Sequence, residues 1–186
     1  MPRPNTIDEA RLVELVQRRD NAAMRELYER HIGYLTAVAA RYVDDETLRD
    51  VLQESFVRIF TSISSFEYRG VGSLRAWMTR IVVNIALGHL RGAVDTTSVD
   101  GLPLTEESEP DTEQVPIEVI HQMIRELPPG YRAVFNLYIF EQRSHREIAS
   151  LLGIGESSSA SQLHRAKAIL AKRINEYKIK NRLTNE

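Results

Sequence analysis

The sequence predicts an all-α protein of two small helical domains joined by a flexible acidic linker, with a helix-turn-helix in the second domain. Apolar residues recur at spacings of three and four along most of the chain, and no alternating strand pattern occurs. Residues 93–115 lack both this periodicity and any basic residue. Near the C-terminus, two helical patterns are separated only by Ile154 and Gly155, the spacing of a helix-turn-helix.

Length and composition bound the class of protein. A chain of 186 residues holds one domain of moderate size or two small ones, and its 42% hydrophobic content allows folded cores. The absence of cysteine excludes disulfides and thiolate metal sites. The N-terminus is polar and no apolar run of 18 residues occurs, so we expect a cytoplasmic protein with no membrane insertion of its own.

The net charge of −2 hides an uneven distribution along the chain. Residues 1–91 hold 13 Lys and Arg against 12 Asp and Glu, and residues 92–118 hold none against 8. Residues 119–186 hold 11 Lys and Arg against 6 Asp and Glu, a net charge of +5. This asymmetry indicates a polyanionic partner for the C-terminal part.

Residues 1–92 form the first predicted domain, with four helices. Each helix has a start signal of the kind that caps a helix N-terminus. The signals are, in chain order, Thr6 with Glu9 as a capping box, Asp20, Asp44 or Asp45, and Ser73 after a break at Gly70 and Gly72.

Residues 93–115 form the predicted linker, and residues 116–186 the second domain. The linker is rich in Asp, Glu, Ser and Thr, and cannot bury enough apolar area to offset the entropy of ordering it. Pro116 suits the first turn of a new helix, which stops before Pro128. A further helix carries Val134 and Leu137.

The stretch GIGESSSASQLHRAK, residues 153–167, is either a flexible serine linker or the start of a recognition helix. Gly153 fits the left-handed position that ends the preceding helix, and Gly155 is an acceptable N-cap for the next. The linker alternative leaves the inward-facing Leu163 and Leu170 with no N-terminal boundary to their helix, so we favour the helix. The residues expected to face a DNA groove are Ser158, Ser159, Ser161, Gln162, Arg165 and Lys167.

Gln162 suits adenine, and Arg165 suits guanine or phosphate. The alternative is that the basic residues form the solvated face of a terminal helix. The preceding turn favours DNA contact, because a helix-turn-helix usually reads DNA.

A glycine-containing loop in the first domain gathers aromatic and cationic side chains. Phe66, Tyr68 and Trp77 lie close in sequence to Arg69 and Arg80. Aromatic faces interleaved with cations suit unpaired bases, because each stacked base contributes about 1–3 kcal/mol. Taken singly, Phe66 and Trp77 are better explained as core residues, whereas Tyr68 and Arg69, beside glycines in a loop, are less easily explained in that way.

The order of these features resembles a known family. The stretches DVLQESFVRIFTSISSF (50–66), SLRAWMTRIVVNIALGHLR (73–91) and ELPPGYRAVFNLYIFEQRSHREIASLLGI (126–154), with the acidic linker between the last two, closely resemble a bacterial extracytoplasmic-function (ECF) sigma factor. The resemblance covers roughly residues 10–176. It implies a dissociable subunit that binds core RNA polymerase and directs it to promoters, with promoter melting and transcription initiation as the result.

The resemblance also implies residue roles and partners. The helix holding Asp50, Gln53 and Glu54 would dock on the clamp helices of the largest catalytic polymerase subunit, and the second domain would meet the flap. A base flipped from the minus-ten element would enter the loop. The minus-ten residues would be Phe66, Tyr68, Arg69, Ser73, Trp77, Arg80 and Asn84, and the groove-facing residues of the recognition helix would read the minus-thirty-five element. An inhibitory anti-sigma factor is common in this family.

Three other classes of protein fit less well. An enzyme would need a catalytic or metal constellation, but the five histidines are scattered singly and no Gly-rich phosphate loop occurs, so we expect neither cofactor nor metal. An ordinary repressor would need a ligand cavity or a dimer helix in residues 1–91. A helical adaptor that binds only protein leaves the basic second domain unused.

Overall fold

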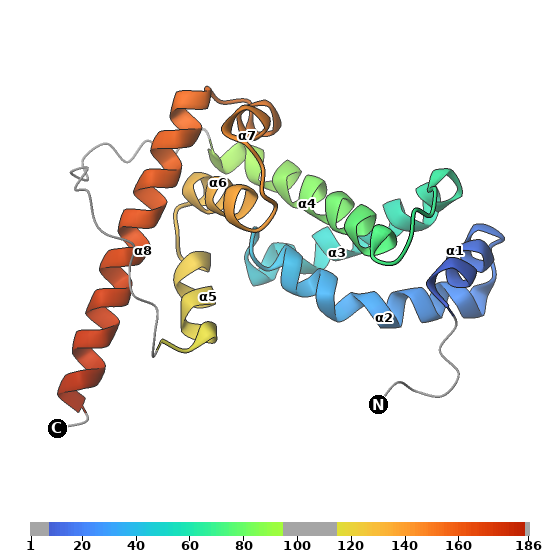
Figure 1. The fold of residues 1–186 in the computed structure, drawn as a ribbon, viewed down its shortest axis with the longest axis horizontal. Helices are drawn as coiled ribbons and strands as arrows, with labels where there is room; N and C mark the ends of the chain where they lie inside the picture. Colours follow the sequence, from blue (N-terminus) through green and yellow to red (C-terminus); the bar gives the residue numbers. More distant parts are fainter. Residues whose placement is uncertain (1–7, 95–114, 185–186) are drawn as a thin grey trace. The chain divides into compact units, whose positions relative to one another are not determined.

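The computed structural model describes residues 8–94 and 115–184, and every regular element in these ranges is helical (Figure 1). This confirms the predicted all-α class. The elements are α1 (Glu9–Gln17), α2 (Asn21–Ala39), α3 (Asp45–Ser62), the short 3-10 helix η1 (Ile63–Ser65), α4 (Ser73–Val94), α5 (Ile117–Arg125), α6 (Pro129–Ile139), α7 (His145–Leu152) and α8 (Glu156–Thr184).

The chain divides into two compact units, Met1–His89 and Leu90–Glu186. Each contains its own buried apolar residues, as the prediction of two helical domains requires. Helix α4 continues to Val94, so it includes the first two residues of the predicted linker. Residues 95–114, which make up nearly all of that linker, lie outside the described residues.

Unit 1 is built by helices that pack in chain order, α1 on α2 and α2 on α3, with η1 against α1 and α3. The predicted caps explain where two of these helices begin. The Asp20 carboxylate accepts a hydrogen bond from the Ala23 N–H at 2.8 Å, and the Asp44 carboxylate accepts one from the Thr47 N–H at 2.9 Å. Thr6, the other half of the predicted first capping box, lies outside the described residues.

His31 of α2 is a buried polar side chain in the unit 1 core, with 6% of its surface exposed. Its Nδ1 has no hydrogen-bond partner among the described residues. Burial first, and then the nearby guanidinium groups of Arg75 and Arg30, lower the pKa of His31 from 6.5 to about 4. The folded chain therefore holds this imidazole neutral.

Unit 1 is expected to lose stability as the pH falls from 6.5 to about 4, because in that window the unfolded chain binds a proton that folded His31 does not. The loss is roughly 2–3 kcal/mol in the free energy of unfolding. Denaturant unfolding of His31→Leu across this range should give a flatter pH profile than the parent chain. His164→Ala, a change at an exposed histidine, should leave the profile unaltered, and an equally steep profile for His31→Leu would contradict the assignment.

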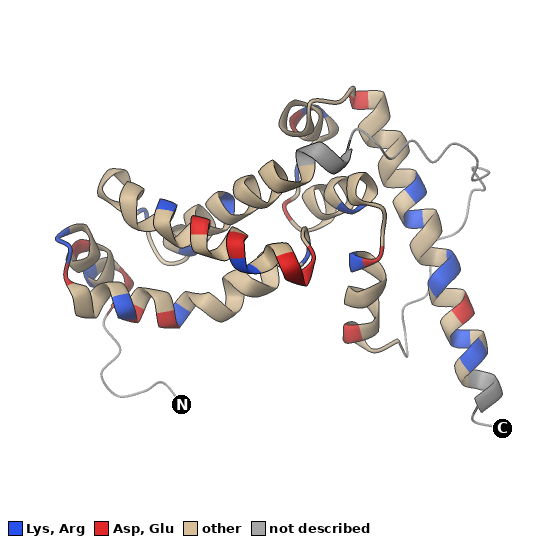
Figure 2. Cartoon of the chain, turned by 180° about the vertical axis from the view of Figure 1, so that it is seen from behind, with Lys and Arg blue, Asp and Glu red and all other residues tan. Residues whose placement is uncertain are grey.

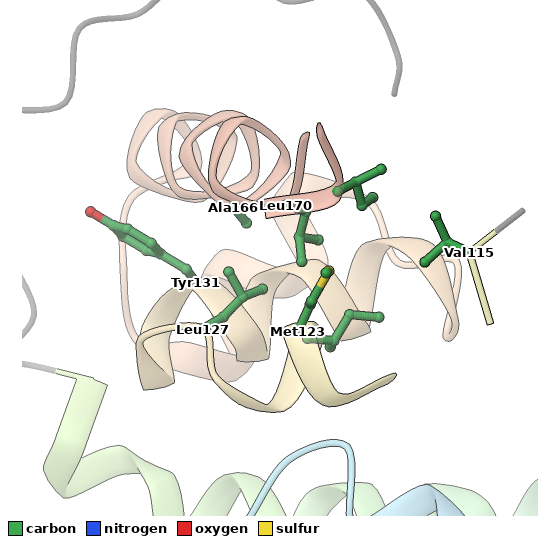
Figure 3. Packing of buried hydrophobic residues seen from close by; sticks show 8 residues of the cluster. Val115, Met123, Leu127, Tyr131, Ala166 and Leu170 are labelled. Carbon is green, nitrogen blue, oxygen red and sulfur yellow. The ribbon is translucent and has the colours of Figure 1, made fainter. Parts of the chain in front are cut away.

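Unit 2 packs α5, α6 and α7 against the long helix α8. Its core brings Leu127 and Tyr131 against Ala166 and Leu170 of α8 (Figure 3). Tyr131 has only 1% of its surface exposed, and Figure 3 shows its hydroxyl pointing away from the cluster. Burying an apolar side chain of this kind contributes about 1.5–3 kcal/mol, which fixes α8 on the shorter helices.

The helix-turn-helix is formed by α7 and α8. Ser144 and Glu147 form a complete capping box at the start of α7, which the sequence reading missed. Gly153 ends α7 in the left-handed conformation with φ of 72°, as predicted. The Gly155 carbonyl then accepts the Ser159 N–H at 3.0 Å in the first turn of α8, so the serine stretch is helical.

Candidate nucleic-acid interface

Residues 66–72, which we call the recognition loop, connect η1 to α4. Gly70 and Gly72 both have positive φ angles, 109° and 89°, which residues with a side chain rarely adopt. The Ser73 hydroxyl donates to the Gly70 carbonyl at 2.6 Å and accepts from the Arg69 N–H at 3.2 Å. Ser73 is the first residue of α4, and its side chain closes the loop onto itself at that point.

The aromatic residues around the recognition loop have different surroundings. The rings of Phe66 and Trp77 pack on each other, with centroids 4.9 Å apart, and both side chains are half-buried. Tyr68 is also half-buried, and its burial together with the carboxylates of Glu9 and Asp8 raises its pKa. Phe66 and Trp77, for which the sequence favoured a core role, thus pack on each other, and each keeps part of its side chain accessible.

The cations near the loop are accessible. The Arg69 side chain is 80% exposed and meets Glu67 at 3.2 Å, a surface ion pair that contributes little to stability. Arg80 is exposed on α4. Both guanidinium groups are therefore open to contact from outside the protein.

A cleft of about 890 Å³ lies between α3 and α4. Trp77 and Asn84 line it from α4, and Glu54 and Arg58 line it from α3. It has a size typical of ligand clefts, and it places an aromatic face and an amide, the groups that stack on and hydrogen-bond to a base, on the same wall.

The predicted polymerase-binding residues lie on one exposed strip of α3. Gln53 lines a groove between α2 and α3 that is otherwise walled mainly by apolar side chains, whereas Glu54 lines the cleft on the other side. Asp50 is exposed and falls between them on the helical wheel. Glu54 also meets His89 Nε2 at 3.3 Å. The strip therefore borders both an apolar groove and the cleft.

Ser159 corrects one prediction for the recognition helix. Its side chain is fully buried, and its hydroxyl lies 2.9 Å from Nδ1 of His145, whose ring stacks on Tyr138. The prediction that Ser159 faces a groove is wrong, because the helical phase turns this position toward α7. Its hydroxyl ties the first turns of α8 to the start of α7.

The other predicted readers on α8 differ in exposure. Ser158, Ser161 and Lys167 are exposed, as a groove contact requires. Gln162 is half-buried, and its Oε1 is buried without a hydrogen-bond partner among the described residues. Arg165 is half-buried and its guanidinium donates to the Tyr131 hydroxyl at 3.4 Å, so contact with DNA requires this side chain to swing outward.

His164 was not among the predicted readers. It is exposed three residues after Ser161 and three before Lys167, on the same face of α8. Further along α8, Lys and Arg dominate the charged positions (Figure 2). The helix thus combines a polar N-terminal face with a basic C-terminal half.

Among residues 8–94 and 115–184, no group of three or more His, Asp or Glu side chains is arranged to hold a metal ion. Nor does any helix in these ranges have the length and apolar character needed to cross a membrane.

Comparisons with known proteins account for both units. The family model for sigma-70 region 2 matches residues 27–95, and the model for sigma-70 region 4 matches residues 117–170. The first range contains the recognition loop, the cleft and the exposed strip of α3, and the second contains the helix-turn-helix. The chain therefore belongs to the sigma-70 family of transcription initiation factors.

Relatives place the chain within that family. It is 29% identical over 178 residues to the ECF RNA polymerase sigma-E factor of Haemophilus influenzae, covering 88% of this chain and 93% of that protein. It is 29% identical over 177 residues to the RNA polymerase sigma-H factor of Pseudomonas aeruginosa, covering 87% and 91%. The chain is an ECF sigma factor. A chain from a solved structure of CnrH in complex with the cytosolic domain of CnrY matches with a TM-score of 0.47 and 23% identity, over 89% of this chain and 96% of the matched chain.

Proposed function

We propose that this sigma factor divides promoter recognition between its two units, with unit 1 docking on core polymerase and holding the melted minus-ten strand while unit 2 holds the minus-thirty-five duplex. As a sigma factor, the chain directs promoter recognition and transcription initiation, and its partners are core RNA polymerase and promoter DNA. The observation that carries the division is that unit 1 joins an aromatic cleft to an exposed polar strip, whereas unit 2 has the helix-turn-helix.

Core docking is assigned to the strip of Asp50, Gln53 and Glu54. Their polar side chains stand at the edge of the apolar α2–α3 groove, which exposes Tyr28 and Val57 at 43% and 58%. An apolar patch rimmed by polar groups is typical of a protein-protein interface. The proposed occupants are the clamp helices of the largest catalytic subunit, and the flap is the proposed partner of unit 2.

The minus-ten strand is assigned to the recognition loop and the α3–α4 cleft. Extruding a base costs a few kcal/mol of lost stacking, so a site that stacks and hydrogen-bonds the extruded base stabilises the opened duplex. Tyr68 and Trp77 offer ring faces, Asn84 offers an amide, and Arg69 and Arg80 offer charge to the backbone. Ser73 and Phe66 support these groups from within the protein.

The minus-thirty-five duplex is assigned to the exposed face of α8. Ser158 and Ser161 let the helix approach the groove closely, and Lys167 meets phosphate. Gln162 reads a base edge once its buried Oε1 turns outward. Arg165 joins them once it leaves Tyr131. Ser159 is removed from this set because it is buried.

The remaining assignments rest on the family. Chemistry belongs to the polymerase, so the chain itself supplies no catalysis and needs no cofactor. An anti-sigma factor is the proposed inhibitory partner. Because the polymerase works in the bacterial cytoplasm, that is the proposed location of this protein.

Promoter opening tests the proposal. Core polymerase with this chain should make thymines around the transcription start reactive to permanganate, and core alone should not. Asn84→Ala removes the proposed hydrogen bond between this amide and the extruded base. A bond of about 0.5–1.5 kcal/mol corresponds to a reduction of roughly 2- to 12-fold in the opened fraction. Arg25→Ala, at an exposed position on α2, is the control and should leave opening unchanged. Full reactivity with Asn84→Ala would argue against the cleft as the strand site.

A further inference from the structure

Helix α1 lies before the segment that the sigma-70 region 2 model matches, which begins at residue 27. Its side chains nevertheless reach the recognition loop. The Gln17 amide donates to two carbonyls, those of Ile63 at 3.0 Å and Phe66 at 2.8 Å, which are 46 and 49 residues away in sequence. These carbonyls belong to η1 and to the first residue of the loop, so Gln17 holds the point where the chain enters the loop.

Glu9, at the other end of α1, holds the point where the chain leaves the loop. Its carboxylate accepts the Gly72 N–H at 3.1 Å, across 63 residues of sequence. Gly72 has a φ of 89°, so this bond fixes a backbone conformation that few residues adopt. The two ends of α1 therefore hold the two ends of the recognition loop.

The turn after α1 adds a third contact. The Arg19 guanidinium donates to the Phe60 carbonyl at 2.6 Å, near the end of α3. Arg19 itself has a φ of 64°, an uncommon conformation for a residue with a side chain, which persists where surrounding contacts determine it. The Arg19 contact therefore anchors the C-terminal end of α1 to α3 immediately before η1 and the loop.

We propose that Glu9 and Gln17 are positioning residues for minus-ten recognition, which hold the recognition loop in the shape that receives the extruded base without touching DNA themselves. This inference rests on the proposed function of the loop. A loop held in its binding conformation loses less conformational entropy when a base enters, so the contacts from α1 raise affinity for the melted strand. The exposed loop residues contact the strand, and α1 sets their geometry.

The test uses the full chain with core polymerase and a forked promoter DNA whose minus-ten non-template strand is single-stranded. Affinity is measured on the intact fork and on forks with one abasic site at each minus-ten position in turn. The parent chain should lose about tenfold or more at the captured base, since stacking carries much of that contact. Gln17→Ala should bind the intact fork about tenfold more weakly, and the abasic site should then cause little further loss.

Comparing the effect of Gln17→Ala on the intact fork with its effect on the abasic forks distinguishes a positioning role from a general loss of stability. A merely structural role for Gln17 would weaken binding to the intact and abasic forks by the same factor, and that result would overturn the inference. The inference would also be overturned if Gln17→Ala bound the intact fork as tightly as the parent chain does. If instead the parent chain is insensitive to every abasic site, the proposed base capture fails, which is a different result from failure of the positioning role.

Matched variants on α1 sharpen the comparison. Glu9→Gln keeps an oxygen that can accept the Gly72 N–H, so it should bind within about twofold of the parent, whereas Glu9→Ala should resemble Gln17→Ala. Arg11→Ala changes an exposed residue of α1 that pairs with Glu14 at 2.6 Å, and it should leave the abasic pattern unchanged. Equal losses for Glu9→Gln and Glu9→Ala would exclude the hydrogen bond as the cause.

Discussion

Glu54→Lys is expected to weaken binding of this chain to core polymerase by about 30- to 4,000-fold. Removing one partner of a docked, hydrogen-bonded charge pair costs about 2–5 kcal/mol, and reversing the charge adds repulsion. The Glu54 side chain is 60% exposed and, among the residues that the structure describes, its ion-pair contact is with His89 at 3.3 Å, so the fold should tolerate the change. Equilibrium binding of labelled chain to core polymerase measures the dissociation constant directly.

Two controls isolate the carboxylate of Glu54. His89→Ala removes the same ion pair but leaves the carboxylate, and it should bind core polymerase within about threefold of the parent, because exposed ion pairs contribute little. Glu29→Lys makes the same charge change at an exposed position on α2 outside the lining of the α2–α3 groove. A dissociation constant for Glu54→Lys within twofold of the parent would contradict docking through this strip of α3.

Local signals in the sequence were sufficient for much of the fold. Asp20 and Asp44 cap helices because each acts on a backbone N–H three residues ahead, which a short window of sequence reveals. Gly153 was predictable for the same reason, since only its own backbone conformation is at issue. The capping box of Ser144 and Glu147 carries an equally local signal, three residues apart, and a systematic search for that spacing finds it.

The orientation of single side chains on α8 was harder to predict. Ser159 was grouped with its exposed neighbours because it is small and polar, although it lies four residues before the inward-facing Leu163 and shares its face; it is buried beside His145. Arg165 appeared as a free cation in the sequence, yet it lies against Tyr131, which is 34 residues away. The position of one face relative to α6 and α7 depends on packing between helices, and a difference of a single position along the helix separates the exposed Ser158 from the buried Ser159.

The contacts from α1 to the recognition loop could not be predicted from sequence. Gln17 bonds to backbone carbonyls, which carry no residue-specific signal, and its partners lie 46 and 49 residues away. The expected role of Glu9 was a local capping box, but its carboxylate accepts the Gly72 N–H instead of serving only its own helix. Long-range bonds from side chain to backbone become visible only when the two segments are brought together in the fold.

The largest effect is expected when this chain is added to core polymerase and promoter-dependent transcription is measured. A sigma factor changes the output of core polymerase from random initiation to defined start sites. In the proposed division of labour the two units provide complementary contacts: unit 1 joins the exposed strip of α3 to the α3–α4 cleft, and unit 2 carries the helix-turn-helix. Neither contact alone selects a start site, since specificity requires the DNA-reading surfaces to be held on the polymerase. Both DNA and core polymerase are therefore needed.

Run-off transcription on genomic fragments, with core polymerase and with or without this chain, measures that dependence directly. We predict transcripts of discrete length only when the chain is present, from start sites that share two upstream elements, and a loss of at least about 30-fold with Glu54→Lys at limiting concentrations of the chain. Tight binding of the chain to those fragments without core polymerase, together with no discrete transcripts when core is added, would contradict the account.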